Sequence, residues 1–158
     1  MQKKITPFLW FDGKAGEAAE FYKSVFGDVK ILDTRYYSDA GPLPKGTVLT
    51  VTFEVFGQEF VGLNGGPHYQ FSPATSFFVS CENQDEVDRY WNGLMDGGTP
   101  QQCGWITDKF GVTWQIVPKL LGEILKDSDG ERVARVMRAM FGMVKLDIAG
   151  LQRAYDGK

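Results

Sequence analysis

Short apolar runs alternate with polar residues through the first part of the chain. β-Branched and aromatic residues dominate four of these runs, which is typical of strands. The four predicted strands cover residues 5–12, 29–37, 47–57 and 58–64. Residues 16–27 place small and aromatic side chains on one helical face and end in Gly27, so we expect a helix after the first strand. The predicted order is strand, helix, strand, strand, strand.

The same order begins again after a stretch that is rich in turn-forming residues. Residues 75–82 predict a strand, and residues 83–98 predict a helix with an apolar stripe on one face. Three short strands are expected to follow, near Thr99, at residues 104–107 and at residues 112–117. The chain is therefore predicted to contain two βαβββ units in tandem, an internal repeat of architecture with little residue identity.

The last forty residues, 119–158, differ from the two units, and part of them follows a helical period. Apolar side chains recur there at Val133, Val136, Met137, Met140, Phe141 and Val144. A second short helix is predicted over residues 146–155. An amphipathic helix must bury its apolar stripe, so we expect this tail to pack on the sheet or on a second subunit. A partner-binding surface is the alternative.

Composition and charge narrow the possible functions. A chain of 158 residues with 43% apolar residues is typical of a soluble globular domain, and a net charge of -3 gives no positive field for a nucleic-acid backbone. Aromatic residues reach 14%, which favours a ligand cavity or a large subunit interface. The apolar run at residues 5–11 is too short for a signal peptide or a membrane span, so we expect a cytoplasmic protein that does not enter membranes.

Several stretches carry a resemblance to a known family. They are the helix end AEFYKSVFG, the mid-chain LNGGP, the strand pair CGWITDKFGVTWQIVP and the tail VMRAMFGMVKLDIAGLQRAY. Together with the paired units they resemble one branch of the vicinal oxygen chelate superfamily, which includes glyoxalase, bleomycin-resistance proteins and extradiol dioxygenases. The branch consists of bacterial proteins labelled demethylubiquinone methyltransferase-like, or PhnB-like.

The resemblance implies a fold and an assembly. The fold class would be α+β, with two tandem βαβββ units forming a curled mixed-sheet cup and a helical C-terminal extension. Residues 1–118 would form a single glyoxalase-like domain made of units 5–67 and 72–118. The tail, 119–158, would pack on this domain or on a dimer partner, because the superfamily often pairs units across subunits. A homodimer is therefore expected.

Metal-using members of the superfamily hold one divalent ion with four strand residues, typically His or Glu. The corresponding positions here are Gln115 on the last strand, Ser76, Gly62, and Pro7 or its neighbour Phe8. A divalent ion with open catalytic positions needs about three imidazole or carboxylate donors. We therefore expect no metal and no other cofactor. Gln115 would then hydrogen-bond a ligand from the pocket wall, or else bond to the backbone beside the next strand.

The predicted pocket wall combines apolar surface with a few polar anchors. The ligand-binding candidates are Gln115, Trp10, Asn64, Ser76, Phe78, Phe53 and Trp105. Such a wall suits a small, partly aromatic organic molecule, as in the bleomycin-resistance relatives. The first hypothesis is a metal-free binding protein. The alternative is a metal-dependent lyase, isomerase or dioxygenase of the same superfamily.

No catalytic residue can be assigned from the sequence. His68 is the only histidine, and it falls in a predicted loop rather than on a strand. Cys81 and Cys103 are 22 residues apart, which predicts free thiols, with a reactive Cys103 as the alternative. The methyltransferase label does not indicate an activity, because strands that follow as adjacent hairpins differ from the doubly wound sheet of the common methyltransferases.

Overall fold

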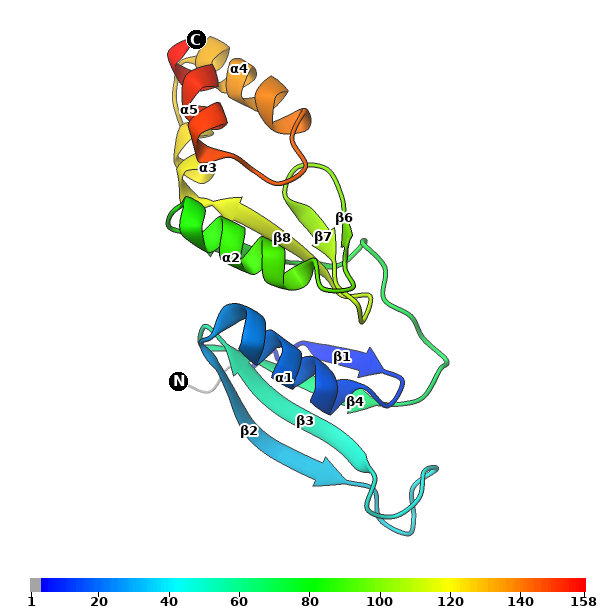
Figure 1. Cartoon of the computed structure of the whole chain (residues 1–158). Coiled ribbons are helices and arrows are strands. Elements are labelled where there is room, and N and C mark those ends of the chain that lie inside the picture. Colours follow the sequence, from blue (N-terminus) through cyan, green and yellow to red (C-terminus); the bar gives the residue numbers. More distant parts are fainter. Residues whose placement is uncertain (1–3) are drawn as a thin grey trace. The chain divides into compact units, whose positions relative to one another are not determined.

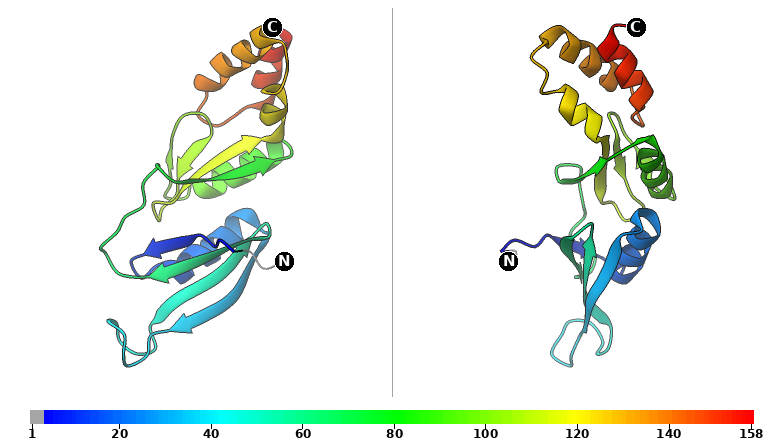
Figure 2. Two further views of the ribbon diagram at one scale, coloured as in Figure 1. Left: turned by 180° about the vertical axis from the view of Figure 1, so that it is seen from behind. Right: turned by 90° about the vertical axis from the view of Figure 1, so that its left-hand side faces the viewer.

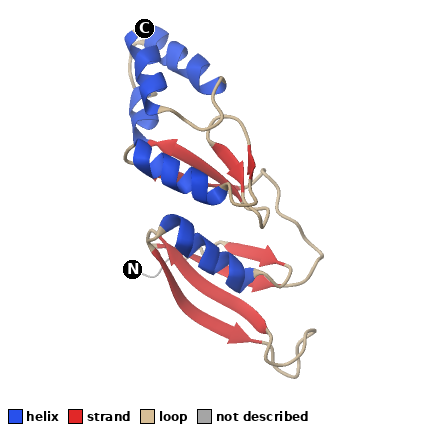
Figure 3. Ribbon diagram, in the orientation of Figure 1, coloured by secondary structure: helices blue, strands red, loops and turns tan. Residues whose placement is uncertain are grey.

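The computed structural model describes residues 4–158, and they form two compact units that divide between Phe71 and Ser72 (Figure 1). Each unit carries its own mixed four-stranded sheet with one helix on one face (Figure 3). The α+β class with two βαβββ units and C-terminal helices is confirmed. Within residues 4–158 neither sheet closes on itself, because each has two edge strands that pair with a neighbour on one side only.

The first unit contains β1 (Phe8–Phe11), α1 (Ala15–Phe26), β2 (Val29–Tyr36), β3 (Val48–Val55) and β4 (Gln58–Asn64). The strand order is β1-β4-β3-β2, with β1 parallel to β4 and the other pairs antiparallel. The β3–β4 hairpin turns on Phe56 and Gly57, which both have positive φ, of 48° and 78°. A two-residue turn of this kind matches the twist of its strands, so the predicted hairpin forms here.

Aromatic side chains fill the space between α1 and its sheet. Tyr22 and Phe26 of the helix are buried, and Phe53 stacks on Phe60 with ring centroids 5.6 Å apart. Small residues on the same helical face let the helix approach closely, because they add little bulk beyond the backbone. These residues are Ala15, Ala18 and Ala19.

The second unit repeats the first. It contains β5 (Ser76–Cys81), α2 (Gln84–Leu94), β6 (Thr99–Pro100), β7 (Trp105–Thr107) and β8 (Thr113–Pro118). Its strand order, β5-β8-β7-β6, is that of the first unit shifted by four strands, and β5 is again parallel to β8. Asn83 begins α2 as its N-cap, since its side chain accepts a hydrogen bond from the amide of Glu86.

Three helices follow β8: α3 (Lys119–Ile124), α4 (Gly130–Phe141) and α5 (Ile148–Asp156). They gather beside the second sheet as one helical cluster (Figure 2). Their buried side chains form a core together with Val117 of β8, and this core includes Leu121, Ile124, Val136, Leu146 and Leu151. The tail therefore packs on the second unit of its own chain.

Backbone hydrogen bonds fasten the segment between α4 and α5 to the β6–β7 loop. The amide of Cys103 donates to the carbonyl of Met143 at 2.9 Å, and the amide of Gly104 donates to that of Val144 at 2.7 Å. Both donors have positive φ, of 60° and 80°. A few residues on, the side chain of Gln84 bonds to the backbone of residues 146 and 148. The tail is thus held at two points of the second unit.

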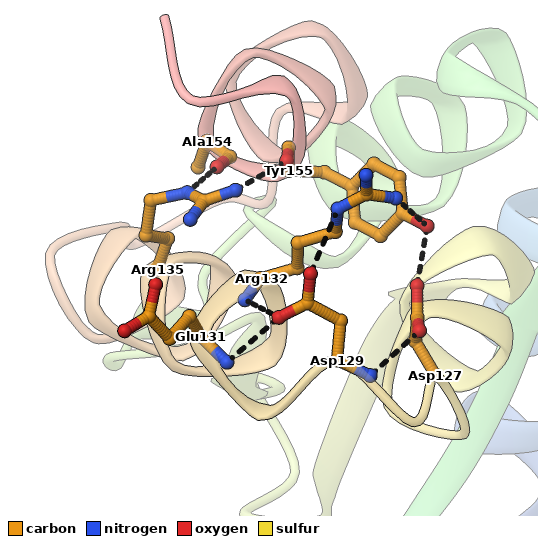
Figure 4. A network of polar contacts seen from close by, with 7 residues as sticks. All are labelled: Asp127, Asp129, Glu131, Arg132, Arg135, Ala154 and Tyr155. Atoms are coloured by element: carbon orange, nitrogen blue, oxygen red, sulfur yellow. Dashed lines mark hydrogen bonds and ion pairs between the residues drawn. The ribbon is translucent and has the colours of Figure 1, made fainter.

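A polar network ties the tail helices to one another (Figure 4). Arg135 donates to the carbonyls of Ala154 and Tyr155, both at 2.9 Å, which satisfies carbonyls at the end of α5. Asp127 accepts a hydrogen bond from the Tyr155 hydroxyl. The amide of Asp129 and this hydroxyl lower the pKa of Asp127 from its ordinary value.

Candidate functional site

The open face of the second sheet lies opposite α2. Strand residues alternate between the two faces. Trp114 and Ile116 of β8 are almost fully buried beneath α2, whereas Gln115 lies between them in sequence and remains half-buried. On β5, Phe78 is 61% exposed between two more buried neighbours. The open face is therefore lined by every second residue of β5, β8 and β7, beginning with Phe78 and Gln115.

One row of this face crosses three strands. Gln115 is the register partner of Phe78 on β5 and also of Trp105 on β7. Residues that are directly paired place their side chains side by side on one face. Gln115 therefore lies between two aromatic residues. We call Phe78, Gln115 and Trp105 the aromatic row.

Gln115 bonds to a side chain of its own face. Its Nε2 donates to the Ser76 Oγ at 2.8 Å. Its Oε1 accepts no hydrogen bond from residues 4–158, so a ligand donor can bind there. The sequence left open a hydrogen bond from Gln115 to the backbone. The side-chain amide instead bonds to the Ser76 hydroxyl. Ser76 and Gln115, two of the predicted candidates, are thus brought together with Phe78 and Trp105.

A second polar row runs beside the first. Thr113 of β8 lies opposite Thr107 of β7, and their Oγ1 atoms are 3.1 Å apart. Gln101 donates from Nε2 to the Thr107 Oγ1 at 2.6 Å. The two hydroxyls are therefore hydrogen-bonded within the protein, and these side chains support the sheet. Gln115 is the better-placed polar anchor for a ligand.

Trp10 lies on β1 of the first unit. Its Nε1 donates to the carbonyl of Gly66 at 2.8 Å, and its ring meets Tyr69 edge to face at 4.9 Å. A Cβ atom at Gly65 would overlap the Trp10 ring, so glycine is required there for this close approach. Trp10 is consequently half-buried under the segment that follows β4.

Phe53 and Asn64 do not lie on an open face, which corrects the prediction made for them. Phe53 is 0% exposed and belongs to the core under α1. Asn64 is buried, and its Oδ1 accepts a hydrogen bond from the amide of Ala15 at 2.9 Å while its Nδ2 donates to the carbonyl of Val48. Asn64 therefore holds the start of α1 to β3 and β4.

Gly62 also lies on the face of the first sheet that packs against α1. A Cβ atom at Gly62 would lie 3.0 Å from that of Ala15, so the position faces α1 and cannot contribute to an open-face site. In the repeat, β4 corresponds to β8 and β1 to β5. Leu63 is paired with Trp10 as Gln115 is paired with Phe78, so Leu63 occupies the position in the first unit that Gln115 occupies in the second. Leu63 offers no metal-binding atom.

Titratable groups are sparse around these faces. Within residues 4–158, no three His, Cys, Asp or Glu side chains gather closely enough to hold a metal ion. His68 is exposed in a turn. Burial, reinforced by the charge of Glu86, raises the pKa of the Cys81 thiol from 9.0 to about 12, so Cys81 stays a neutral core residue. Cys103 is half-buried, which leaves its thiol accessible in part.

Asp108, in the turn before β8, is buried. Its carboxylate accepts hydrogen bonds from the amides of Phe110 and Val112 and from the indole Nε1 of Trp114, at 2.8, 3.0 and 2.9 Å. The three donors make it an anchor for the turn into β8, and the Asp-x-x-Gly pattern was the available signal.

Known proteins resemble this chain over the two repeats. A family model described as 3-demethylubiquinone-9 3-methyltransferase matches residues 3–117. A Bacillus cereus protein described as 3-demethylubiquinone-9 3-methyltransferase, PhnB protein, is 37% identical with a TM-score of 0.67, over 73% of this chain and 99% of that chain. The match to the family model ends two residues before α3, so the tail lies outside it.

More distant structures share the fold alone. Protein PA1353 from Pseudomonas aeruginosa is 22% identical with a TM-score of 0.61, over 74% of this chain and 98% of that chain. The fosfomycin resistance protein FosX from Listeria monocytogenes, complexed with Mn(II) and sulfate, is 14% identical with a TM-score of 0.54, over 72% and 89%. No curated protein matches the chain. The family match and the similarity to the Bacillus cereus protein show that this chain belongs to the PhnB-like 3-demethylubiquinone-9 3-methyltransferase family of the vicinal oxygen chelate superfamily.

Proposed function

We propose that the protein binds a small, uncharged organic molecule on the open face of the second sheet, with Gln115 as its polar anchor and without a metal ion. The observation that carries this proposal is the aromatic row, in which an amide with a free carbonyl oxygen lies between Phe78 and Trp105. Apolar walls with a few fixed polar groups are typical of sites for small organic molecules. Ser76 holds the amide in one orientation, so little ordering is required when a ligand binds.

Chemistry that needs a metal ion is not favoured by this donor set. The open-face positions on β5 and β8 offer one amide and hydroxyls, whereas divalent metals with catalytic roles take imidazole or carboxylate ligands. Methyl transfer is not proposed either, despite the family description. Each unit is built from adjacent hairpins and one parallel pair, unlike the parallel doubly wound sheet that binds the usual methyl donor.

The proposal includes a homodimer. Apolar side chains are exposed on the edge strand β2 of the first unit, where Ile31 is 39% and Leu32 is 49% exposed. An edge strand with exposed apolar side chains offers a surface for pairing with another chain. Light scattering at micromolar concentration tests the dimer, and a mass of one chain would contradict it.

Within residues 4–158 no helix is both long and apolar enough to cross a membrane.

A ligand-observed NMR screen with uncharged aromatic amides and ketones tests the proposed function. We expect compounds that bind the native protein to lose about tenfold in affinity in Gln115→Ala, because one hydrogen bond and its neighbouring contacts are removed. Gln70→Ala is the matched control, since Gln70 is exposed in the segment between the units. Hits that bind both variants equally would place the ligand elsewhere and contradict the proposal.

A further inference from the structure

A cavity of about 720 Å³ lies where the tail meets the β6–β7 loop of the second unit. One wall comes from residues 100–105 and the other from the end of α4 and the residues after it. The lining residues that matter here are Gln102, Cys103, Trp105, Met140, Phe141 and Val144. Trp105 also belongs to the aromatic row, so this cavity adjoins the site proposed above.

The two walls are fixed to each other before any ligand arrives. The amides of Cys103 and Gly104 donate to the carbonyls of Met143 and Val144, so the loop wall and the tail wall share two backbone hydrogen bonds. Lys145 extends the attachment through an ion pair with Asp88 at 2.6 Å. A preformed pocket loses less conformational freedom on binding than one that must assemble.

The lining has a clear chemical character. Among residues 4–158, no Asp, Glu, Lys, Arg or His contributes to it. Phe141 is 61% exposed and Val144 is 43% exposed, so the cavity keeps apolar surface in contact with water. The side-chain amide of Gln102 makes no hydrogen bond to any residue among 4–158, and that of Gln101 uses its Nε2 on Thr107, so amide groups lie beside the apolar walls. This combination suits an uncharged molecule with an aromatic or aliphatic body and a hydrogen-bonding group.

The size of the cavity agrees with that ligand. Pockets for small organic molecules enclose about 300–1,000 Å³, and 720 Å³ lies within this range. Met140, Phe141 and Val144 lie in the part of the chain beyond residue 117, where the match to the family model ends. One wall of the cavity therefore comes from the extension.

We propose that the C-terminal extension forms part of an open binding pocket, in which Phe141 and Val144 of the tail and Trp105 of β7 contact an uncharged, largely apolar organic molecule. The inference deepens the proposed function, on which it rests through Trp105. It assigns to the tail the selection of apolar, uncharged ligands, and to Gln102 the polar contact at the cavity.

Fluorescence titration with N-phenyl-1-naphthylamine, an uncharged aromatic probe, tests the inference on the full chain. We expect saturable binding that weakens by about tenfold in Phe141→Ser, because an apolar wall is lost. Phe141→Leu should keep the affinity within about threefold, since it preserves apolar surface. Phe8→Ser is the matched control, because Phe8 is 63% exposed in the first unit. Unchanged melting temperatures show that Phe141→Ser leaves the fold intact.

Gln115→Ala separates this inference from the proposed function. Weaker binding in Phe141→Ser but not in Phe8→Ser supports the tail pocket, whether or not Gln115→Ala also weakens the probe. Weaker binding in Gln115→Ala alone would support the aromatic row and overturn the tail pocket. Equal affinities in Phe141→Ser and Phe8→Ser, or no saturable binding by the native protein, would also overturn it.

Discussion

Gln115 and Ser76, 39 residues apart in the sequence, are joined by a hydrogen bond of 2.8 Å between the amide Nε2 and the hydroxyl Oγ. The bond links the neighbouring parallel strands β8 and β5 across the open face. A double-mutant cycle measures it: Gln115→Ala and Ser76→Ala should each lower the free energy of unfolding by about 0.5–1.5 kcal/mol, with a coupling of about 0.5–1 kcal/mol. Fully additive effects in urea denaturation would contradict the bond.

Gly104 holds the tail to the β6–β7 loop, since its amide donates to the carbonyl of Val144. Its φ of +80° disfavours any side chain, and a Cβ atom there would lie 2.7 Å from the carbonyl oxygen of Ile116 and 3.0 Å from Leu146. We expect Gly104→Ala to lower the free energy of unfolding by about 2–4 kcal/mol and to expose the tail to proteolysis.

The control for this prediction is Gly122→Ala. Gly122 lies within α3, and nothing within 4 Å would meet its Cβ atom. Alanine should therefore be neutral or should stabilise the protein by up to about 1 kcal/mol. Equal stability of the two variants would show that the close approach at Gly104 does not hold the tail.

Asp108 should be sensitive to the loss of its charge. In Asp108→Asn one carboxylate oxygen becomes an NH₂ that cannot accept, so either the amides of Phe110 and Val112 or the indole Nε1 of Trp114 lose their acceptor, and we expect a loss of about 2–4 kcal/mol in unfolding free energy. Asp12→Asn, at an exposed position after β1, should change it by less than about 0.5 kcal/mol. A small effect at Asp108 in thermal or urea denaturation would argue that its buried hydrogen bonds contribute little.

Cys81 makes the folded state sensitive to alkali. Its folded pKa of about 12 exceeds the unfolded value of 9.0, so the unfolded chain releases this proton first and stability falls as the pH rises from 9 towards 12. At pH 10.5 this group alone should cost about 2 kcal/mol relative to pH 8. Cys81→Ala should show a correspondingly smaller alkaline loss in urea denaturation.

Thiol reactivity offers a second readout at neutral pH. In the native protein Cys103 should react with a disulfide reagent well before Cys81, because only Cys103 is partly accessible. Mass spectrometry of the labelled peptides identifies which thiol has reacted. Simultaneous labelling of both would show that the core around Cys81 opens as readily as the loop.

Hydrophobic periodicity predicted most of the fold, because strands and helices of normal length repeat their apolar residues often enough to be recognised. It did not predict α3, whose six residues are too few to establish a period. Alternation grouped Phe60, Gly62 and Asn64 on one face, but it could not tell which face would meet α1. That choice depends on packing against Ala15, which no local pattern reports.

The candidate site was predictable only where neighbouring strands are close in the sequence or are related by the repeat. Alternation groups Ser76 with Phe78 on β5 and Gln115 with Thr113 on β8, but only the strand register brings Gln115 beside Phe78 and Trp105. The cavity at the tail depends on positive φ at Cys103 and Gly104, which directs two amides towards residues some forty positions later. Contacts of this kind arise from tertiary packing, so a sequence pattern cannot supply them.

The measurement that tests the central claim most directly is metal content. The protein is purified without chelator, its metals are quantified, and its melting temperature is then recorded with Zn²⁺, Ni²⁺, Mn²⁺ and Fe²⁺. A protein whose open face offers Gln115 and Ser76 in place of His or Glu should contain far less than one metal per chain and show no metal-dependent rise in melting temperature. A stoichiometric metal, or a large rise that follows saturation by one ion, would contradict metal-free binding.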